Sequence, residues 1–139
     1  MNVLETEWWS IALPPEWWAD TEEDSILISD RDAVGTIEIS TLHKAEGEFH
    51  SEDVAQLAQE ESAGPQVWQA TLLGDFAGVS AASEEEDTAL REWFVACGSL
   101  LLYVTYSCEL ENRGMDDAAV DALLDTLCVL DAGQVPQDA

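Results

Sequence analysis

Two histidines and two glutamates lie close together in one segment of the sequence. His43 and His50 flank Glu46 and Glu48, and imidazole and carboxylate groups are both ligands for zinc and other divalent metals. The segment has no helical or strand pattern, so nothing fixes these four side chains in one geometry. A polar loop in front of a helix is the more common explanation. We therefore expect no metal site and no cofactor.

Nucleophilic and acid–base chemistry has no clear candidate either. Cys97, Cys108 and Cys128 follow neither a CxxC nor a zinc-ligand spacing, and their apolar neighbours predict buried, reduced thiols. A reactive cysteine needs a cationic setting, and the chain has only 4 Lys and Arg. Among 30 acidic residues no catalytic pair stands out, and the sequence has no phosphate-binding glycine loop or serine nucleophile motif. We expect no catalytic residues and a protein that is not an enzyme.

The residues best placed to bind a partner lie on a predicted β-hairpin. Gly98-Ser99 separates two apolar runs, which is typical of a two-residue type II′ turn. This turn fixes the register of the two strands and places a uniformly apolar set of side chains on one face. That set, which needs a helix over it, is Trp93, Val95, Cys97, Leu100, Leu102 and Val104.

The opposite face of this hairpin mixes aromatic, apolar and polar side chains, so we expect it to be the more accessible. Rigid apolar area with hydrogen-bonding groups around it is typical of a protein-binding surface. The candidate binding residues are Glu92, Phe94, Tyr103 and Thr105 of the hairpin and Thr36, Glu38 and Ser40 of a neighbouring strand. The alternative is that a helix over 51–62 covers this face.

The elements that carry these residues follow from the periodicity of the sequence. Alternation of apolar and polar residues predicts further strands over 9–13, 26–28, 34–42, 68–73 and 76–82. Ser51 caps a helix that ends at Ala63-Gly64-Pro65, and Asp116 caps a second helix with an apolar stripe. The expected fold is α+β: a mostly antiparallel sheet of about six to seven strands with two main helices.

Two tryptophan pairs, Trp8-Trp9 and Trp17-Trp18, stand near the start of the chain. Neighbouring residues on a strand face opposite sides, so one member of each pair points inward. The outward member either covers the edge of the core or anchors an interface. We favour the first and expect Trp17 to pack into the core edge.

Size and charge limit the possible partners. The chain has 139 residues and a formal net charge of −26, which indicates one domain over 1–139, with an ordered core over about 8–130 and a tail over 131–139. The charge excludes nucleic acid and anionic membranes as partners. The first residues are not basic, and the longest mainly apolar stretch, Trp93 to Tyr106, is too short for a spanning helix. We expect a cytoplasmic protein.

The order of the predicted elements resembles the PsbP-like superfamily. Its local motif, Leu-Pro-x-x-Trp, matches Leu13-Pro14-Pro15-Glu16-Trp17, and the resemblance spans Trp9 to about Leu130. The superfamily includes DcrB-type bacterial proteins, a Ran-binding nuclear import factor and the Eag-type chaperones of type VI secretion. This chain is far more acidic and lacks the signal or lipid attachment of the DcrB branch, which favours a cytosolic branch. The resemblance implies a PsbP-like fold and a binding surface on the sheet, and it transfers no catalytic residue.

We expect a cytosolic, non-enzymatic binding protein, of the kind represented by secretion-associated chaperones and adaptors. It would shelter a protein client, basic or with an apolar segment, on its sheet face. The alternative is an acidic inhibitor or immunity-like protein that blocks a basic cleft of a partner enzyme. The acidity is also compatible with a salt-rich cytoplasm, where it serves solubility alone, and a homodimer is compatible with the sequence.

Overall fold

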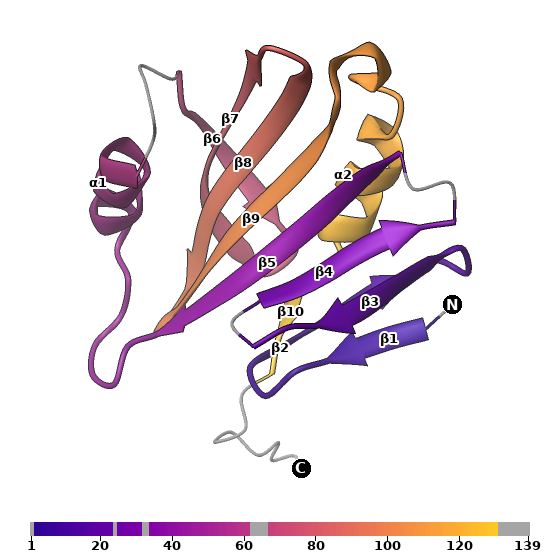
Figure 1. The fold of residues 1–139 in the computed structure, drawn as a ribbon. Helices are drawn as coiled ribbons and strands as arrows, with labels where there is room; N and C mark the ends of the chain where they lie inside the picture. Colours follow the sequence, from indigo (N-terminus) through magenta and orange to yellow (C-terminus); the bar gives the residue numbers. More distant parts are fainter. Residues whose placement is uncertain (1, 24, 32–33, 62–66, 131–139) are drawn as a thin grey trace.

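The fold combines two antiparallel sheets with two α-helices (Figure 1). A computed structural model describes residues 2–23, 25–31, 34–61 and 67–130. The elements of the first half are β1 (Asn2–Glu5), β2 (Trp9–Leu13), β3 (Trp17–Thr21), β4 (Ser25–Asp30), β5 (Gly35–His43) and α1 (Ser51–Glu61). Those of the second half are β6 (Gln69–Leu73), β7 (Phe76–Glu85), β8 (Thr88–Cys97), β9 (Leu100–Glu109), the 3₁₀ turn η1 (Leu110–Asn112), α2 (Asp117–Leu124) and β10 (Cys128–Val129). The predicted α+β class is confirmed.

Seven strands form the main sheet, in the order β3-β4-β5-β9-β8-β7-β6. The smaller sheet has the order β1-β2-β10, so the second strand of the chain pairs with the last described one. Every neighbouring pair in both sheets is antiparallel. The six- to seven-strand prediction therefore fits the main sheet, and it missed the smaller one.

The main core lies between one face of the large sheet, called the inner face here, and a layer formed by α2 and the small sheet. The apolar hairpin side chains Trp93, Val95, Leu102 and Val104 are all buried there, as expected. From the opposite layer the core receives Trp9, Ile11 and Leu13 of β2 and Val120, Leu123 and Leu124 of α2. The hairpin register thus decides which face of the sheet forms the core.

The β8–β9 turn has the predicted geometry. Gly98 has a φ of 61°, and Ser99 is not among the described residues with positive φ. A positive φ at the first central residue alone is the type II′ pattern, which suits the twist of a hairpin. Cys97 accordingly pairs with Leu100, and Phe94 pairs with Tyr103.

The helix α1 lies on the other face of the large sheet, called the outer face here. Its Val54 and Ala58 pack on Phe94 and Leu101 in a second, smaller cluster. This helix contacts β7 and β8 and leaves the β3–β4–β5 side of the outer face uncovered by any described element.

Several elements differ from the predictions. The strands β1, β3 and β10 were not predicted, since β1 and β3 carry polar or acidic residues and β10 has only two residues. Asp116 precedes α2 as expected, but its Oδ2 accepts a hydrogen bond from the Tyr106 hydroxyl at 2.8 Å, and no N–H of the helix binds its side chain.

The predicted tail over 131–139 lies outside the described residues. None of the described helices is long and apolar enough to cross a membrane.

Candidate functional site

The uncovered part of the outer face, called the open face here, consists of outward side chains of β4, β5 and β9. Cross-strand pairing places them in rows, in which Ser29 pairs with Thr36 and Leu27 with Glu38. The open face comprises Ser25, Leu27 and Ser29 of β4, Thr36, Glu38 and Ser40 of β5, and Tyr103, Thr105 and Ser107 of β9. All nine side chains are exposed or half-buried. Five of the seven predicted binding residues belong to this surface.

The other two predicted residues are buried, which corrects the expectation that this whole side of the hairpin is accessible. Phe94 is 3% exposed because α1 and Trp68 pack over it. Glu92 is 7% exposed. The helix therefore covers the β7–β8 half of the outer face, and the half that carries Thr36, Glu38 and Ser40 stays open.

Tyr103 stands at the border between the covered and the open half. Its ring stacks on Phe94 with a centroid distance of 4.5 Å, and its hydroxyl donates a hydrogen bond of 2.6 Å to Oε2 of Glu92. Burial and this hydrogen bond raise the pKa of Tyr103 above its ordinary value. The stacking and the hydrogen bond hold the Tyr103 side chain in place at one side of the open face, and its hydroxyl stays protonated.

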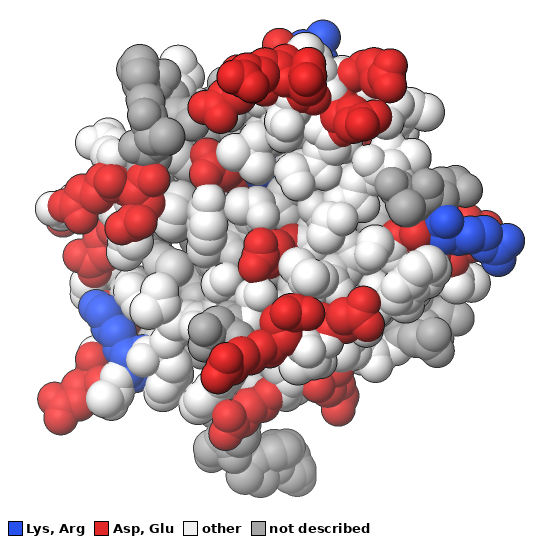
Figure 2. Space-filling model, viewed as in Figure 1, with Lys and Arg blue, Asp and Glu red and all other residues white. Residues whose placement is uncertain are grey.

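Hydroxyl groups dominate the rest of the open face. Ser25 donates a hydrogen bond of 2.9 Å to Oε2 of Glu38, and Glu38 pairs across the sheet with Leu27 on one side and Thr105 on the other. In the space-filling view, acidic side chains gather around a largely uncharged area that is broken by single carboxylates (Figure 2). Short hydroxyl side chains around a few apolar ones can bind an extended or helical polypeptide through both hydrogen bonds and contact area.

Exposed apolar side chains border this surface at both ends. Trp18 of β3 pairs with Ser29 and is 49% exposed, and Leu42 of β5 is 52% exposed. Trp17, which precedes Trp18 in the sequence, is buried in the main core at 6% exposure, in agreement with the prediction. Trp18 is therefore the outward member of its pair and extends the open face by one aromatic ring.

The histidines and cysteines considered for metal and thiol chemistry are not part of the open face. His43 stacks on Trp8 with a centroid distance of 4.2 Å, and His50 precedes α1. No group of three or more metal-ligating side chains occurs in the described part of the chain. The three cysteines are free, but only Cys108 is buried; Cys97 is half-buried and Cys128 exposed, which corrects the expectation of three buried thiols. Burial raises the pKa of both Cys97 and Cys108, so both thiols stay protonated.

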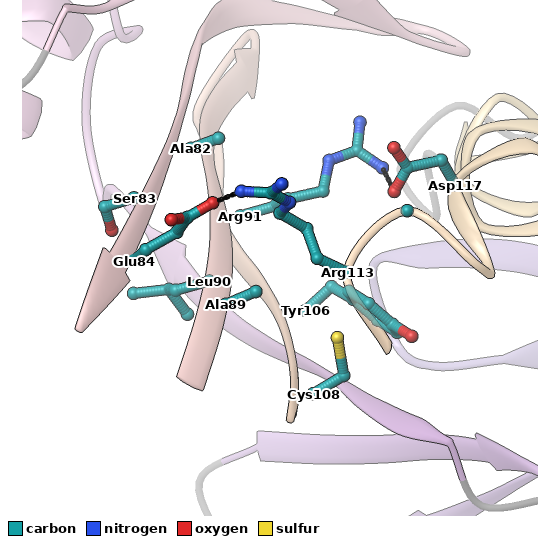
Figure 3. Close-up of a pocket in the computed structure, with 11 residues that line it drawn as sticks. Ala82, Ser83, Glu84, Ala89, Leu90, Arg91, Tyr106, Cys108, Arg113 and Asp117 are labelled. Atoms are coloured by element: carbon teal, nitrogen blue, oxygen red, sulfur yellow. Dashed lines mark hydrogen bonds and ion pairs between the residues drawn. The ribbon is translucent and has the colours of Figure 1, made fainter. Parts of the chain in front are cut away.

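A pocket of about 420 Å³ between the β7–β8 hairpin and the start of α2 was not predicted (Figure 3). Arg91 and Arg113, half of the four basic residues of the chain, line it. Arg91 binds Asp117 at 3.4 Å and Asp121 at 2.8 Å, and Arg113 pairs with Glu84. Because acidic partners already engage both guanidinium groups, the pocket is held together by its charges and offers no free cation for a ligand. One feature of the sequence indicated this pocket. The chain has few basic residues, and two of them, Arg91 and Arg113, precede the acidic residues of the predicted second helix.

Comparisons with known proteins agree on the fold. No protein-family model and no curated protein matches the sequence. A crystal structure of a protein from Bacteroides thetaiotaomicron superposes with a TM-score of 0.67 at 17% identity, covering 91% of this chain and 47% of that chain. The chain thus spans about half the length of that protein.

Two further solved structures cover most of both chains. LpqN, a protein involved in cell envelope biogenesis of Mycobacterium tuberculosis, superposes with a TM-score of 0.57 at 13% identity over 88% of this chain and 83% of its own. The cyanobacterial PsbP protein CyanoP of Synechocystis superposes with a TM-score of 0.58 at 6% identity over 88% and 86%. The chain therefore has the PsbP-like fold.

Proposed function

We propose that this protein is a non-enzymatic binding protein that holds a protein client on the open face. The observation that carries this proposal is the chemistry of that surface. A chain with 30 acidic residues places there a broad area of hydroxyl and apolar groups, with Glu38 as the one carboxylate among its nine side chains and Asp20 of β3 at its border, beside Leu27. A sheet face that only needed solubility would carry charges, as the acidic rim around this face does.

The client proposed is a protein segment that is basic or apolar. Leu27, Tyr103 and the bordering Trp18 supply apolar contact area, and Glu38 supplies a single anion for a basic side chain. The net charge of −26 favours approach of a basic partner and disfavours nucleic acid and anionic membranes. In finer detail we propose a cytoplasmic chaperone or adaptor connected with secretion, a role supported by the sequence resemblance to Eag-type chaperones and by the PsbP-like fold.

A matched pair of substitutions tests this proposal. Thr36 and Thr21 are both exposed strand threonines, but alternation along the strands places Thr36 on the open face and Thr21 on the inner side of β3. Each is changed to arginine, and client capture from the native host is compared with that by the parent protein.

The Thr36→Arg variant is expected to lose the client because a long cationic side chain then occupies the open face. The Thr21→Arg variant should retain it. Equal capture by both variants and the parent would remove the open face as the binding surface.

The acidic rim around the open face supports a second candidate (Figure 2). An inhibitor that blocks a basic cleft would bind through these carboxylates and not through the hydroxyl groups between them. Its complex would weaken steeply with ionic strength and would tolerate Thr36→Arg, so the same pair of variants separates the two functions.

A further inference from the structure

The strand β6 ends the seven-stranded sheet and has a free edge. It pairs with β7 on one side, and no described strand pairs with its other side. Its sequence, Gln69–Leu73, contains no charged residue and no proline, although charges and prolines are the usual protection of an edge strand. In a chain with 24% charged residues, such an unprotected edge requires an explanation.

The backbone groups that point out of this edge follow from the turn. Leu73 and Phe76 flank the two-residue turn between β6 and β7, so they form a hydrogen-bonded pair. Hydrogen-bonded and non-hydrogen-bonded pairs alternate along an antiparallel ladder, which makes Leu72–Ala77 and Ala70–Val79 non-hydrogen-bonded pairs. The N–H and C=O groups of Ala70 and Leu72 therefore face away from β7, toward the free edge.

A hollow adjoins this strand on each face of the sheet. On the outer face a groove of about 570 Å³ lies between Phe49 and Val54 on the α1 side and Ala70 and Leu72 of β6, over a floor that includes Ala77. None of its described lining residues is acidic. Leu72, at 70% exposure, stands at its margin.

The hollow on the inner face has a different lining. It measures about 310 Å³ and is lined by the polar side chains Gln69, Ser80 and Arg91 and by Val67, which is 80% exposed. Successive side chains of an added strand would point alternately to the two faces. One set would lie beside Ala70 and Leu72, at the margin of the apolar groove, and the other beside Gln69 and Thr71 on the inner face.

We infer that β6 is a second docking site, which takes up an extended segment of a partner protein as an eighth strand of the sheet. Backbone hydrogen bonds to Ala70 and Leu72 provide the affinity, and the side chains that β6 presents on each face select those of the added strand. The segment alternates apolar residues, which pack beside Ala70 and Leu72 on the outer face, with polar ones, which lie beside Gln69 and Thr71 on the inner face. It is uncharged or basic, because the protein carries a net charge of −26.

A second copy of this chain is a poorer occupant. Pairing two β6 edges would bring together two molecules of net charge −26, and the repulsion between them opposes association. The docking site is separate from the open face, which lies across α1 on the β3–β4–β5 side of the sheet.

The test uses a fluorescent nine-residue peptide that alternates valine and threonine and has a lysine at each end. The control peptide has the same composition, with the valines and threonines in two blocks. Binding to the purified protein is followed by fluorescence anisotropy, and amide hydrogen exchange of Ala70 and Leu72 is measured with and without peptide. The alternating peptide should bind and slow exchange at both amides, and the block peptide should bind more weakly.

The decisive variant is Ala70→Pro, with Ala70→Ser as its control. Proline removes an N–H that points to the free edge and no hydrogen bond of the β6–β7 ladder, so the fold should be kept. Ala70→Pro is expected to weaken peptide binding by about tenfold, because one acceptor of the added strand loses its hydrogen bond, and Ala70→Ser should bind like the parent. Thermal melts of both variants verify folding.

Three results would overturn the inference: no peptide binding by the parent, unchanged binding by folded Ala70→Pro, or a parent dimer that Ala70→Pro converts to a monomer. The last would identify a second copy as the occupant. Thr36→Arg should bind the peptide normally, so failure at this edge can be distinguished from failure of the client proposal for the open face.

Discussion

Trp17 and Trp18 show how differently two identical neighbours are used. Trp17 is 6% exposed in the main core, and Trp18 is 49% exposed beside the open face. We expect Trp17→Ala to lower the free energy of unfolding by about 3–5 kcal/mol, the usual cost of removing a buried aromatic side chain. Trp18→Ala should leave stability nearly unchanged and weaken client capture.

Chemical denaturation and capture with both variants measure the two effects. A large loss of stability in Trp18→Ala would mean that its ring covers the core and does not serve the open face. Similar stabilities for Trp17→Ala and the parent would contradict the core assignment of Trp17.

The chain has two tyrosines, and both are held in their protonated form. Burial and hydrogen bonds to Glu92 and Asp116 raise the pKa of Tyr103 and of Tyr106 above the ordinary value of 10. A group whose pKa is raised by folding stabilises the protein fully below its unfolded pKa, and this contribution is lost as the pH rises toward the folded pKa. Stability should therefore fall steadily above about pH 10.

The ultraviolet absorbance of tyrosinate tests this directly. The native protein should show almost none above pH 10, until unfolding releases both side chains together. Tyr103→Phe should flatten the decline in stability, with Tyr106→Phe as the second arm. An early, separate ionisation of one tyrosine in the folded protein would show that its hydroxyl is not protected.

At the scale of elements, Arg91 adds ion pairs to the apolar contacts that hold α2 on the large sheet. Arg91 of β8 binds Asp117 and Asp121, which lie one helical turn apart, and its guanidinium stacks over Trp93 at 4.6 Å. Asp117 and Asp121 repel each other on the helix surface, and the arginine offsets that repulsion.

Arg91→Gln is expected to lower the free energy of unfolding by about 1 kcal/mol, since the side chain is partly exposed and its ion pairs are screened by solvent. Arg113→Gln is the matched control. Its pair with Glu84 is more exposed and should contribute less. Denaturant melts that show equal losses for the two variants would contradict the role given to Arg91.

Elements with a strong local pattern were predictable from the sequence. The β8–β9 hairpin, its turn and its register follow from Gly98-Ser99 between alternating residues. The helix α1 starts at Ser51, close to its predicted start, but the residue in the cap position is His50, whose C=O accepts a hydrogen bond from the Val54 N–H. The covering of Phe94 by the helix was one of two alternatives, and the sequence did not decide between them, because local periodicity does not state which strands a helix packs against. The same is true of β10, whose pairing with β2 depends on contacts between the two ends of the chain.

The candidate site was likewise predictable only as far as local alternation along each strand. Thr36, Glu38, Ser40, Tyr103 and Thr105 were correctly placed on one face by alternation. The burial of Glu92 and Phe94 depends on where α1 lies along that face, and the edge of β6 depends on the order of strands. Both are tertiary facts that a periodic pattern leaves open.

At the scale of the whole molecule, the charge opposes folding. A net charge of −26 on 139 residues produces repulsion throughout the surface, and the ion pairs among the described residues involve only Lys44, Arg91 and Arg113. The screening length falls from about 10 Å at 0.1 M salt to about 3 Å at 1 M. We expect the melting temperature to rise clearly between dilute buffer and molar NaCl.

Thermal melts in NaCl and in equally concentrated sucrose separate screening from general solvent effects, since sucrose carries no charge. A melting temperature that responds equally to both, or to neither, would show that the acidic side chains are already compensated within the fold.

The pairing of β2 with β10 determines when this protein can fold during its synthesis. Trp9, Ile11 and Leu13 leave the ribosome well before Cys128–Val129, which complete their sheet. The Ala12 N–H donates its hydrogen bond to the Thr126 hydroxyl, which is synthesised 114 residues later. Until then an apolar strand stays uncovered on the nascent chain, where it can associate wrongly. Ribosome-bound chains that stop before β10 should therefore bind nascent-chain chaperones and be cut readily by proteases, and both properties should disappear once β10 has emerged.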